Sequence, residues 1–163
     1  MEIVAYIDGG ARGNPGPAGY GVRVEDNAGT LLEEMYEPIG LATNNVAEYR
    51  GLLAALAYAG ARGCRVVHIR SDSLLLVKQM RGEYRVKHPG LKALHREARD
   101  LVAHFDRVSF EHVPRERNAE ADRLANLAMD MVEGGQAPDA ERKAAAPVAR
   151  GRGTERPKPG KLF

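Results

Sequence analysis

The hydrophobic periodicity of the chain changes from strand-like to helical near Thr43, and this change restricts the folds available to it. Before that point, residues 2–8, 20–25 and 30–36 are rich in β-branched and aromatic residues, which is typical of strands. The residues between the last two segments suit a tight hairpin, and the Gly-rich residues 9–17 are expected to form a structured turn. This part of the chain therefore predicts a three-stranded antiparallel meander.

From Thr43 the apolar residues recur at helical spacing as far as Gly60, and strand-like and helical segments then alternate. We predict, in chain order, a strand at residues 66–72, helices at 74–80 and 91–104, a strand at 108–113 and a last helix that follows an N-cap at Asn118. This order gives an α/β fold: a mixed five-stranded sheet, with three antiparallel strands and then two parallel strands, flanked by helices.

Size and composition fit one folded domain. A chain of 163 residues with 44% hydrophobic content can bury a substantial core. No apolar run approaches the roughly 18 residues of a membrane span, and the N-terminus lacks signal-peptide features, so we expect a cytoplasmic protein without membrane contact. Cys64 is the single cysteine, which excludes an intrachain disulfide and a thiolate-rich zinc site and favours a buried hydrophobic role.

Positive charge is concentrated at the C-terminal end. Residues 134–163 carry seven basic and three acidic residues, a net charge of +4, so the overall +2 leaves −2 for residues 1–133. The segment is rich in Ala, Pro, Gly and Arg and has no apolar periodicity, so we predict a catalytic domain at 1–133 and a disordered basic tail or linker at 134–163. Nonspecific nucleic-acid binding is an alternative role for this tail, and a linker to a further domain is the one we favour.

Four acidic residues occupy positions where a carboxylate is costly. Asp8 and Asp72 each follow an apolar strand, and parallel neighbours would bring them to the same sheet edge. Glu48 lies beside the apolar stripe of the first helix, and Asp122 lies in the first turn of the last helix. Each residue taken singly also suits a turn, a cap or a favourable interaction with a helix dipole.

Together, these four carboxylates form an oxygen-only ligand set of the kind that Mg²⁺ or Mn²⁺ prefers. Two such ions about 3.5–4 Å apart can activate water and stabilise the leaving oxygen of a phosphodiester. The pattern therefore indicates a metal-dependent nuclease.

Four sequence blocks resemble the signatures of type I ribonuclease H. They are YIDGGARGNPGPAGYG at 6–21, TNNVAE at 43–48, SDS at 71–73 and NAEAD at 118–122, and together they span most of residues 1–132. The resemblance implies a ribonuclease H-like fold and a monomeric endonuclease that cuts the RNA strand of RNA–DNA hybrids, leaving 5′-phosphate and 3′-hydroxyl ends. It assigns Asp8, Glu48, Asp72 and Asp122 as the catalytic ligands of two metal ions.

The same resemblance implies which residues contact the hybrid. By this resemblance, the loop after Asp8 would touch the minor groove together with Asn44 and Asn45, at the place where the 2′-hydroxyl distinguishes RNA from DNA. Asn14 and Thr43 would meet the phosphates of the DNA strand. The implied substrate-binding residues are Gly9, Gly10, Asn14, Thr43, Asn44 and Asn45. A turn at Asn14 and a helix cap at Thr43 or Asn44 are the alternatives, and a cap can also serve as a contact.

Two features depart from the longer family members. Residues 114–117 are too few to hold their His-bearing loop, so Arg115 is a candidate to contact the scissile phosphate in its place, with a solvated surface Arg as the alternative. Residues 84–90 are too few for a long basic protrusion, although this part of the chain, from residue 81, still offers Arg81, Arg85, Lys87 and His88. This short form resembles the ribonuclease H domain that some actinobacterial proteins fuse to a phosphatase-like domain, and similar archaeal forms. Cleavage of double-stranded RNA and a noncatalytic nucleic-acid-binding module remain alternative functions.

Overall fold

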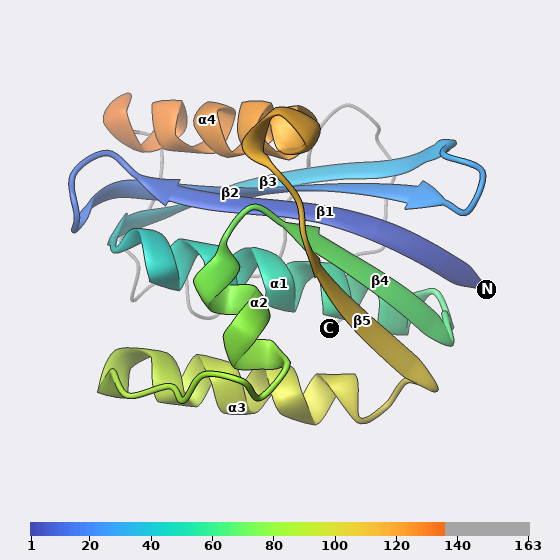
Figure 1. The fold of residues 1–163 in the computed structure, drawn as a ribbon. Coiled ribbons are helices and arrows are strands. Elements are labelled where there is room, and N and C mark those ends of the chain that lie inside the picture. The colour runs from blue at the N-terminus through green and yellow to red at the C-terminus, as the bar shows by residue number, and fades with distance from the viewer. Residues whose placement is uncertain (136–163) are drawn as a thin grey trace.

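A mixed sheet with the strand order β3-β2-β1-β4-β5 organises residues 1–135, which are the residues that this computed structural model describes (Figure 1). β1 (Glu2–Ala11), β2 (Gly16–Asp26) and β3 (Leu31–Ala42) form the antiparallel part. β4 (Val66–Ser71) pairs parallel with β1, and β5 (Arg107–His112) pairs parallel with β4. The predicted fold class is therefore confirmed.

Helices cover both faces of this sheet. α1 (Asn44–Ala61) packs on β1, and α2 (Leu74–Met80) and α3 (Pro89–Val102) lie on the same side, beyond α1 in Figure 1. α4 (Ala119–Glu133) packs on β2 on the opposite side, after a short 3₁₀ turn, η1 (Arg115–Asn118). No helix in the described residues is long and apolar enough to cross a membrane.

The core lies mainly between the sheet and α1. Alternate β1 residues such as Ile3 and Ile7 are fully buried, as the two-residue period of a strand requires. Tyr49 of α1 is also buried, and its hydroxyl donates a 2.6 Å hydrogen bond to Oε1 of buried Gln79 in α2. This bond ties α2, which starts beside Asp72, to the helix that carries Glu48. Cys64 is a buried free cysteine, as expected.

The prediction of a turn directly after Asp8 is wrong. β1 continues to Ala11 because β2 pairs with it throughout, from Ile3 with Asp26 to Ala11 with Ala18. Gly9 is in this strand because α1 passes close by: a β-carbon there would lie 2.4 Å from the Ala47 carbonyl carbon. The turn is confined to residues 12–15.

The other predicted elements are confirmed in type and order, with shifted ends. β3 extends to Ala42, six residues past the expected end, because its pairing with β2 continues to Gly16. α3 begins two residues early, at Pro89, with the His88 ring accepting the Gly90 N–H as a cap. The predicted tail, apart from its first two residues, lies outside the described part of the chain.

Candidate active site

The sheet brings Asp8 and Asp72 to adjacent positions. The parallel pairing of β1 with β4 ends at Ile7 opposite Ser71; Asp8 is the next residue of β1, and Asp72 directly follows the end of β4. Neighbouring strands lie about 4.8 Å apart, so the two carboxylates leave the backbone side by side. The predicted pairing of these acids at the carboxyl edge of parallel strands is confirmed.

α1 places Glu48 at the same edge because Gly9 has no side chain that would keep this helix away from β1. A β-carbon on Gly9 would lie 2.4 Å from the backbone nitrogen of Glu48, so this helix contacts the strand one residue after Asp8. Glu48 is half-buried, and the Ser73 hydroxyl forms a hydrogen bond with its carboxylate. This hydrogen bond partly offsets the cost of placing a carboxylate in a half-buried position.

α4 brings Asp122 close through a second glycine. Gly21 pairs with Asp8 across the antiparallel ladder, and a β-carbon on Gly21 would lie 2.5 Å from the carbonyl oxygen of Ala121. Asp122 follows Ala121 directly, and its carboxyl group hydrogen-bonds with that of Asp8. Four carboxylates from four elements thus meet at one edge of the sheet.

The pKa values reflect this crowding. Burial, followed by the charge of Asp72, the hydrogen bond with Asp122 and the remaining carboxylates, raises the pKa of Asp8 to about 8. Burial raises the pKa of Glu48 to about 7, although the Ser73 hydrogen bond opposes the rise. Burial and the charge of Asp122 also raise the pKa of Asp72, and the positive charge of Arg115 opposes this rise. Near neutral pH the cluster therefore retains protons.

The donor chemistry of the cluster suits a divalent cation. All four side chains offer oxygen, and within residues 1–135 none of them forms an ion pair with Lys, Arg or His. A divalent cation would offset the mutual repulsion that raises the pKa of Asp8. In the described part of the chain, no three His, Cys, Asp or Glu side chains stand close enough to enclose an ion by themselves. The ligand atoms are therefore of the type that a divalent metal ion prefers, and the four side chains would have to move closer together to coordinate it.

Asn118 has a role that differs from the predicted helix cap. Its side chain is buried and forms no capping bond, because η1 leads directly into α4. Its amide Nδ2 instead donates a 2.9 Å hydrogen bond to the carbonyl oxygen of Ile7, the residue before Asp8. Asn118 therefore ties the strand that carries Asp8 to the helix that carries Asp122.

The residues expected to bind substrate fall into three groups. Thr43 caps α1 by accepting the Val46 N–H, and the Asn14 side-chain oxygen accepts the Asn44 N–H at 3.0 Å, so these residues form one cluster with Asn45 beside them. Cap and turn, the alternatives for these residues, are thus both present. Gly9 and Gly10 lie within β1, toward α1 and α4 respectively. Arg115 lies on η1, apart from the Asn14 cluster and near Asp72.

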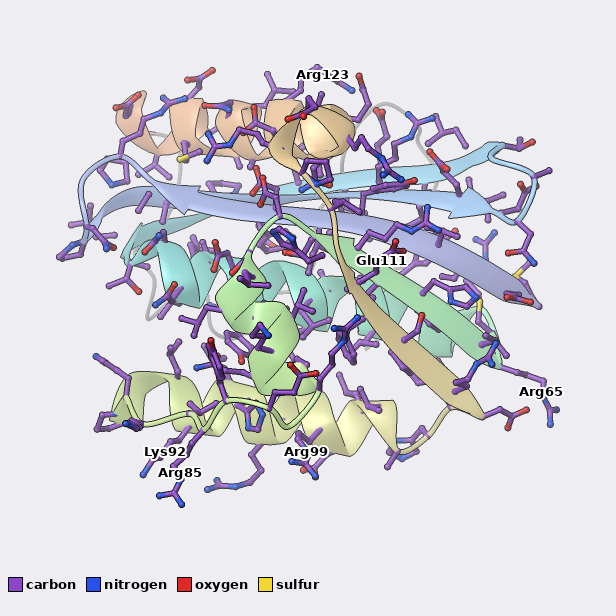
Figure 2. All side chains as sticks on the ribbon, in the orientation of Figure 1. Arg65, Arg85, Lys92, Arg99, Glu111 and Arg123 are labelled. Atoms are coloured by element: carbon purple, nitrogen blue, oxygen red, sulfur yellow. The ribbon has the colours of Figure 1, made fainter. Side chains whose placement is uncertain are left out.

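A cationic hollow lies on the face of the molecule that carries α2 and α3. Its volume is about 640 Å³, and its lining includes Arg85, Lys92, Arg96 and Arg99 together with one acid, Asp100. None of these four cations forms an ion pair within the described residues, whereas Arg12, Arg23, Arg65, Arg70 and Arg123 all do. Figure 2 shows Arg85, Lys92 and Arg99 extending outward along this edge.

Comparisons with known proteins are decisive for the family. Residues 6–128 match the family model described as reverse transcriptase-like. The ribonuclease HI of Halobacterium salinarum is 44% identical over 129 residues, which are 79% of this chain and 65% of that protein. The crystal structure of RNase H1 from that archaeon, at 43% identity, covers 80% of this chain and 98% of its own, with a TM-score of 0.77. The chain belongs to the type I ribonuclease H family.

Two further relatives have solved structures. LC11-RNase H1, from compost, was crystallised in complex with an RNA/DNA hybrid; it is 44% identical and covers 80% of this chain and 99% of its own, with a TM-score of 0.77. The bifunctional protein Rv2228c of Mycobacterium tuberculosis is 50% identical over 142 residues, which are 86% of this chain and 39% of that protein. The structure of its N-terminal RNase H domain is 49% identical and covers 84% of this chain and 99% of its own, with a TM-score of 0.81. Our chain thus spans about two fifths of the length of Rv2228c.

Proposed function

We propose that this protein is an endoribonuclease that hydrolyses the RNA strand of RNA–DNA hybrids. The observation that carries the proposal is the meeting of Asp8, Glu48, Asp72 and Asp122 at one sheet edge without an ion pair to any of them in the described residues. The hybrid in the complex of LC11-RNase H1 supports this choice of substrate. The proposed products carry 5′-phosphate and 3′-hydroxyl ends.

The four carboxylates are the proposed ligands of two divalent cations, Mg²⁺ or Mn²⁺. Such ions supply an activated water and neutralise charge at the phosphodiester when bound. Asp8 and Glu48 are half-buried, which places their carboxylates in surroundings less polar than bulk water, and the Ser73 hydroxyl orients the Glu48 carboxylate. The positive charge of Arg115, next to Asp72, is placed to attract the phosphate to be cleaved.

Two surfaces would hold the duplex. In the first, the Asn14 oxygen is occupied by the Asn44 N–H, which leaves the Asn14 amide nitrogen to donate to a phosphate or hydroxyl. The second is the cationic hollow. α2 has seven residues and rises about 10 Å from the Asp72 edge toward this hollow, a length of about three base-pair steps. One short duplex can therefore reach both the acids and the hollow.

Cleavage of a labelled 20-base-pair hybrid in Mg²⁺, in Mn²⁺ and in EDTA tests the proposal. We expect cleavage with either metal, none in EDTA and none with Asp72→Asn. Asp106→Asn is the matched control, because Asp106 is an exposed acid that pairs with Arg65 at the other end of β5. Activity of Asp72→Asn equal to that of the wild type would refute the assigned roles.

The same assay with an RNA duplex and a DNA duplex, at one salt concentration, decides between the alternatives. Preference for the hybrid supports the proposal, and equal cleavage of double-stranded RNA supports the broader nuclease, since both duplexes present a wide minor groove with 2′-hydroxyls. Binding of hybrid without cleavage in either metal would indicate the noncatalytic module. Ligation of the product by an enzyme that requires a 5′-phosphate tests the expected ends.

A further inference from the structure

The loop between β1 and β2, residues 12–15, is attached to α4 by a single side chain. The Arg12 guanidinium donates to Asn126 Oδ1 at 2.8 Å through Nη2 and to Asp130 Oδ1 at 2.6 Å through Nη1, which also contacts Glu133. These three acceptors follow one another at intervals of four and three residues, so they lie along one face of the helix. Arg12 therefore contacts α4 along about two turns.

The other side of the loop is attached to α1. The side-chain oxygen of Asn14 accepts the backbone N–H of Asn44, the first residue of that helix. The backbone of Arg12 closes the loop by donating to the Pro17 carbonyl at 2.8 Å. The loop thus bridges α4 and α1 across the edge of the sheet, and it carries Asn14, one of the proposed substrate contacts.

The Arg12 contacts are better suited to fixing the orientation of the loop than to stabilising the folded protein. Its side chain is 32% exposed, and ion pairs of this exposure contribute little to the free energy of folding. A planar guanidinium with several acceptors fixes direction, because its donors point along set lines. The loop also contains Gly13, whose φ of +97° is a backbone conformation that side chains other than glycine rarely adopt.

We propose that Arg12 is a positioning residue for substrate binding: it clasps the loop to α4 and so keeps Asn14 against the start of α1. The substrate in this inference rests on the proposed function, whereas the clasp itself rests on the contacts above. Direct contact of Arg12 with a substrate phosphate is the competing role for a cation at this edge. The two roles make opposite predictions for variants of Asp130 and Glu133, the α4 acids that hold Arg12.

Steady-state cleavage of the hybrid separates them. We expect Arg12→Ala to raise KM about five- to tenfold with kcat within about twofold, and Arg12→Lys to have an intermediate effect. The double variant Asp130→Asn with Glu133→Gln should raise KM as well, and adding Arg12→Ala to it should have little further effect, because all three changes break one clasp. Direct phosphate contact predicts instead that the double variant lowers KM, since it frees Arg12 and removes two negative charges.

Arg123→Ala provides the matched control. Arg123 is another α4-linked arginine held by two carboxylates, Glu34 and Glu120, and it is labelled in Figure 2. We expect its removal to leave KM unchanged. A rise in KM equal to that of Arg12→Ala would show a general effect of charge loss and would overturn the clasp.

A measurement without substrate separates this inference from the proposed function. The Asn44 amide hydrogen is bonded to Asn14, so its exchange with deuterium reports on the loop directly. We expect Arg12→Ala to accelerate this exchange at least about fivefold while core amides of β1 keep their rates. Unchanged exchange at Asn44 would overturn the clasp whatever the activity. Accelerated exchange in a protein whose wild type neither binds nor cuts hybrid would leave the clasp standing and reject the proposed function.

Discussion

Asp8→Asn should stabilise the metal-free protein while abolishing its proposed activity. Burial and the neighbouring acids raise the Asp8 pKa from 3.8 to about 8, so the folded state keeps a proton that the unfolded chain releases. Wild-type stability is therefore fully present below about pH 4 and declines as pH rises to about 8. Asparagine does not titrate, so the advantage of the variant is near zero at pH 4 and grows to a plateau above pH 8.

The size of this effect follows from the pKa shift. A shift of about four units corresponds to an upper limit of about 6 kcal/mol. The protonation of Asp8 is coupled to the neighbouring carboxylates, so only part of this limit is realised when one of them is removed, and we expect about 2–3 kcal/mol at pH 8. For a domain of this size that is about 5–10 °C in Tm.

Thermal unfolding in EDTA between pH 4 and pH 9 measures the difference, with Asp106→Asn, which removes an exposed acid outside the cluster, as the control. Added Mg²⁺ or Mn²⁺ should reduce or reverse the stability difference between Asp8→Asn and the wild type, because a cation at a hundred times its Kd stabilises the wild type by about 2.7 kcal/mol. An Asp8→Asn variant that is less stable than wild type at pH 8, or a difference independent of pH, would refute the crowded-carboxylate reasoning.

Two further predictions concern packing and substrate affinity. Gly21→Ala should cost about 2–3 kcal/mol in urea unfolding, because its methyl group would meet the Ala121 carbonyl oxygen at 2.5 Å, whereas Gly10→Ala should cost less than about 1 kcal/mol because it meets only the flexible Met129 methyl at 3.2 Å. Equal costs would contradict the close approach of α4. Replacing Lys92, Arg96 and Arg99 by Gln should lower the slope of log KM against log salt by about 2–3, since each lost phosphate contact removes about 0.9, with kcat unchanged. An unchanged slope would remove the cationic hollow from the binding surface.

The order of the elements could be predicted from the sequence because each segment has a clear period. The strand-like residues before Thr43 and the helical spacing after it indicated the mixed sheet, and the acids at the ends of apolar runs indicated two of the four carboxylates, Asp8 and Asp72. Glycine was misleading at Gly9, because the same residue marks a turn and a close helix contact. Only the position of α1, which is set by the whole fold, distinguishes the two.

The polar supports of the site could not be predicted for a related reason. Arg12 meets partners 114 to 121 residues away, and Asn118 meets Ile7 at a separation of 111 residues. Local sequence favours a surface arginine and a helix cap at these positions. Nothing in the spacing indicates that each instead joins β1 to α4.

The two glycines that let helices touch the sheet also set a rule for protein engineering. Copying the four acids onto another α/β scaffold would transfer the ligand types but not the depth at which they meet. At Gly9 and at Gly21 a single added methyl group would push a whole helix outward and carry Glu48 or Asp122 away with it. A transplanted site therefore needs six residues, and two of them contribute by having no side chain at all.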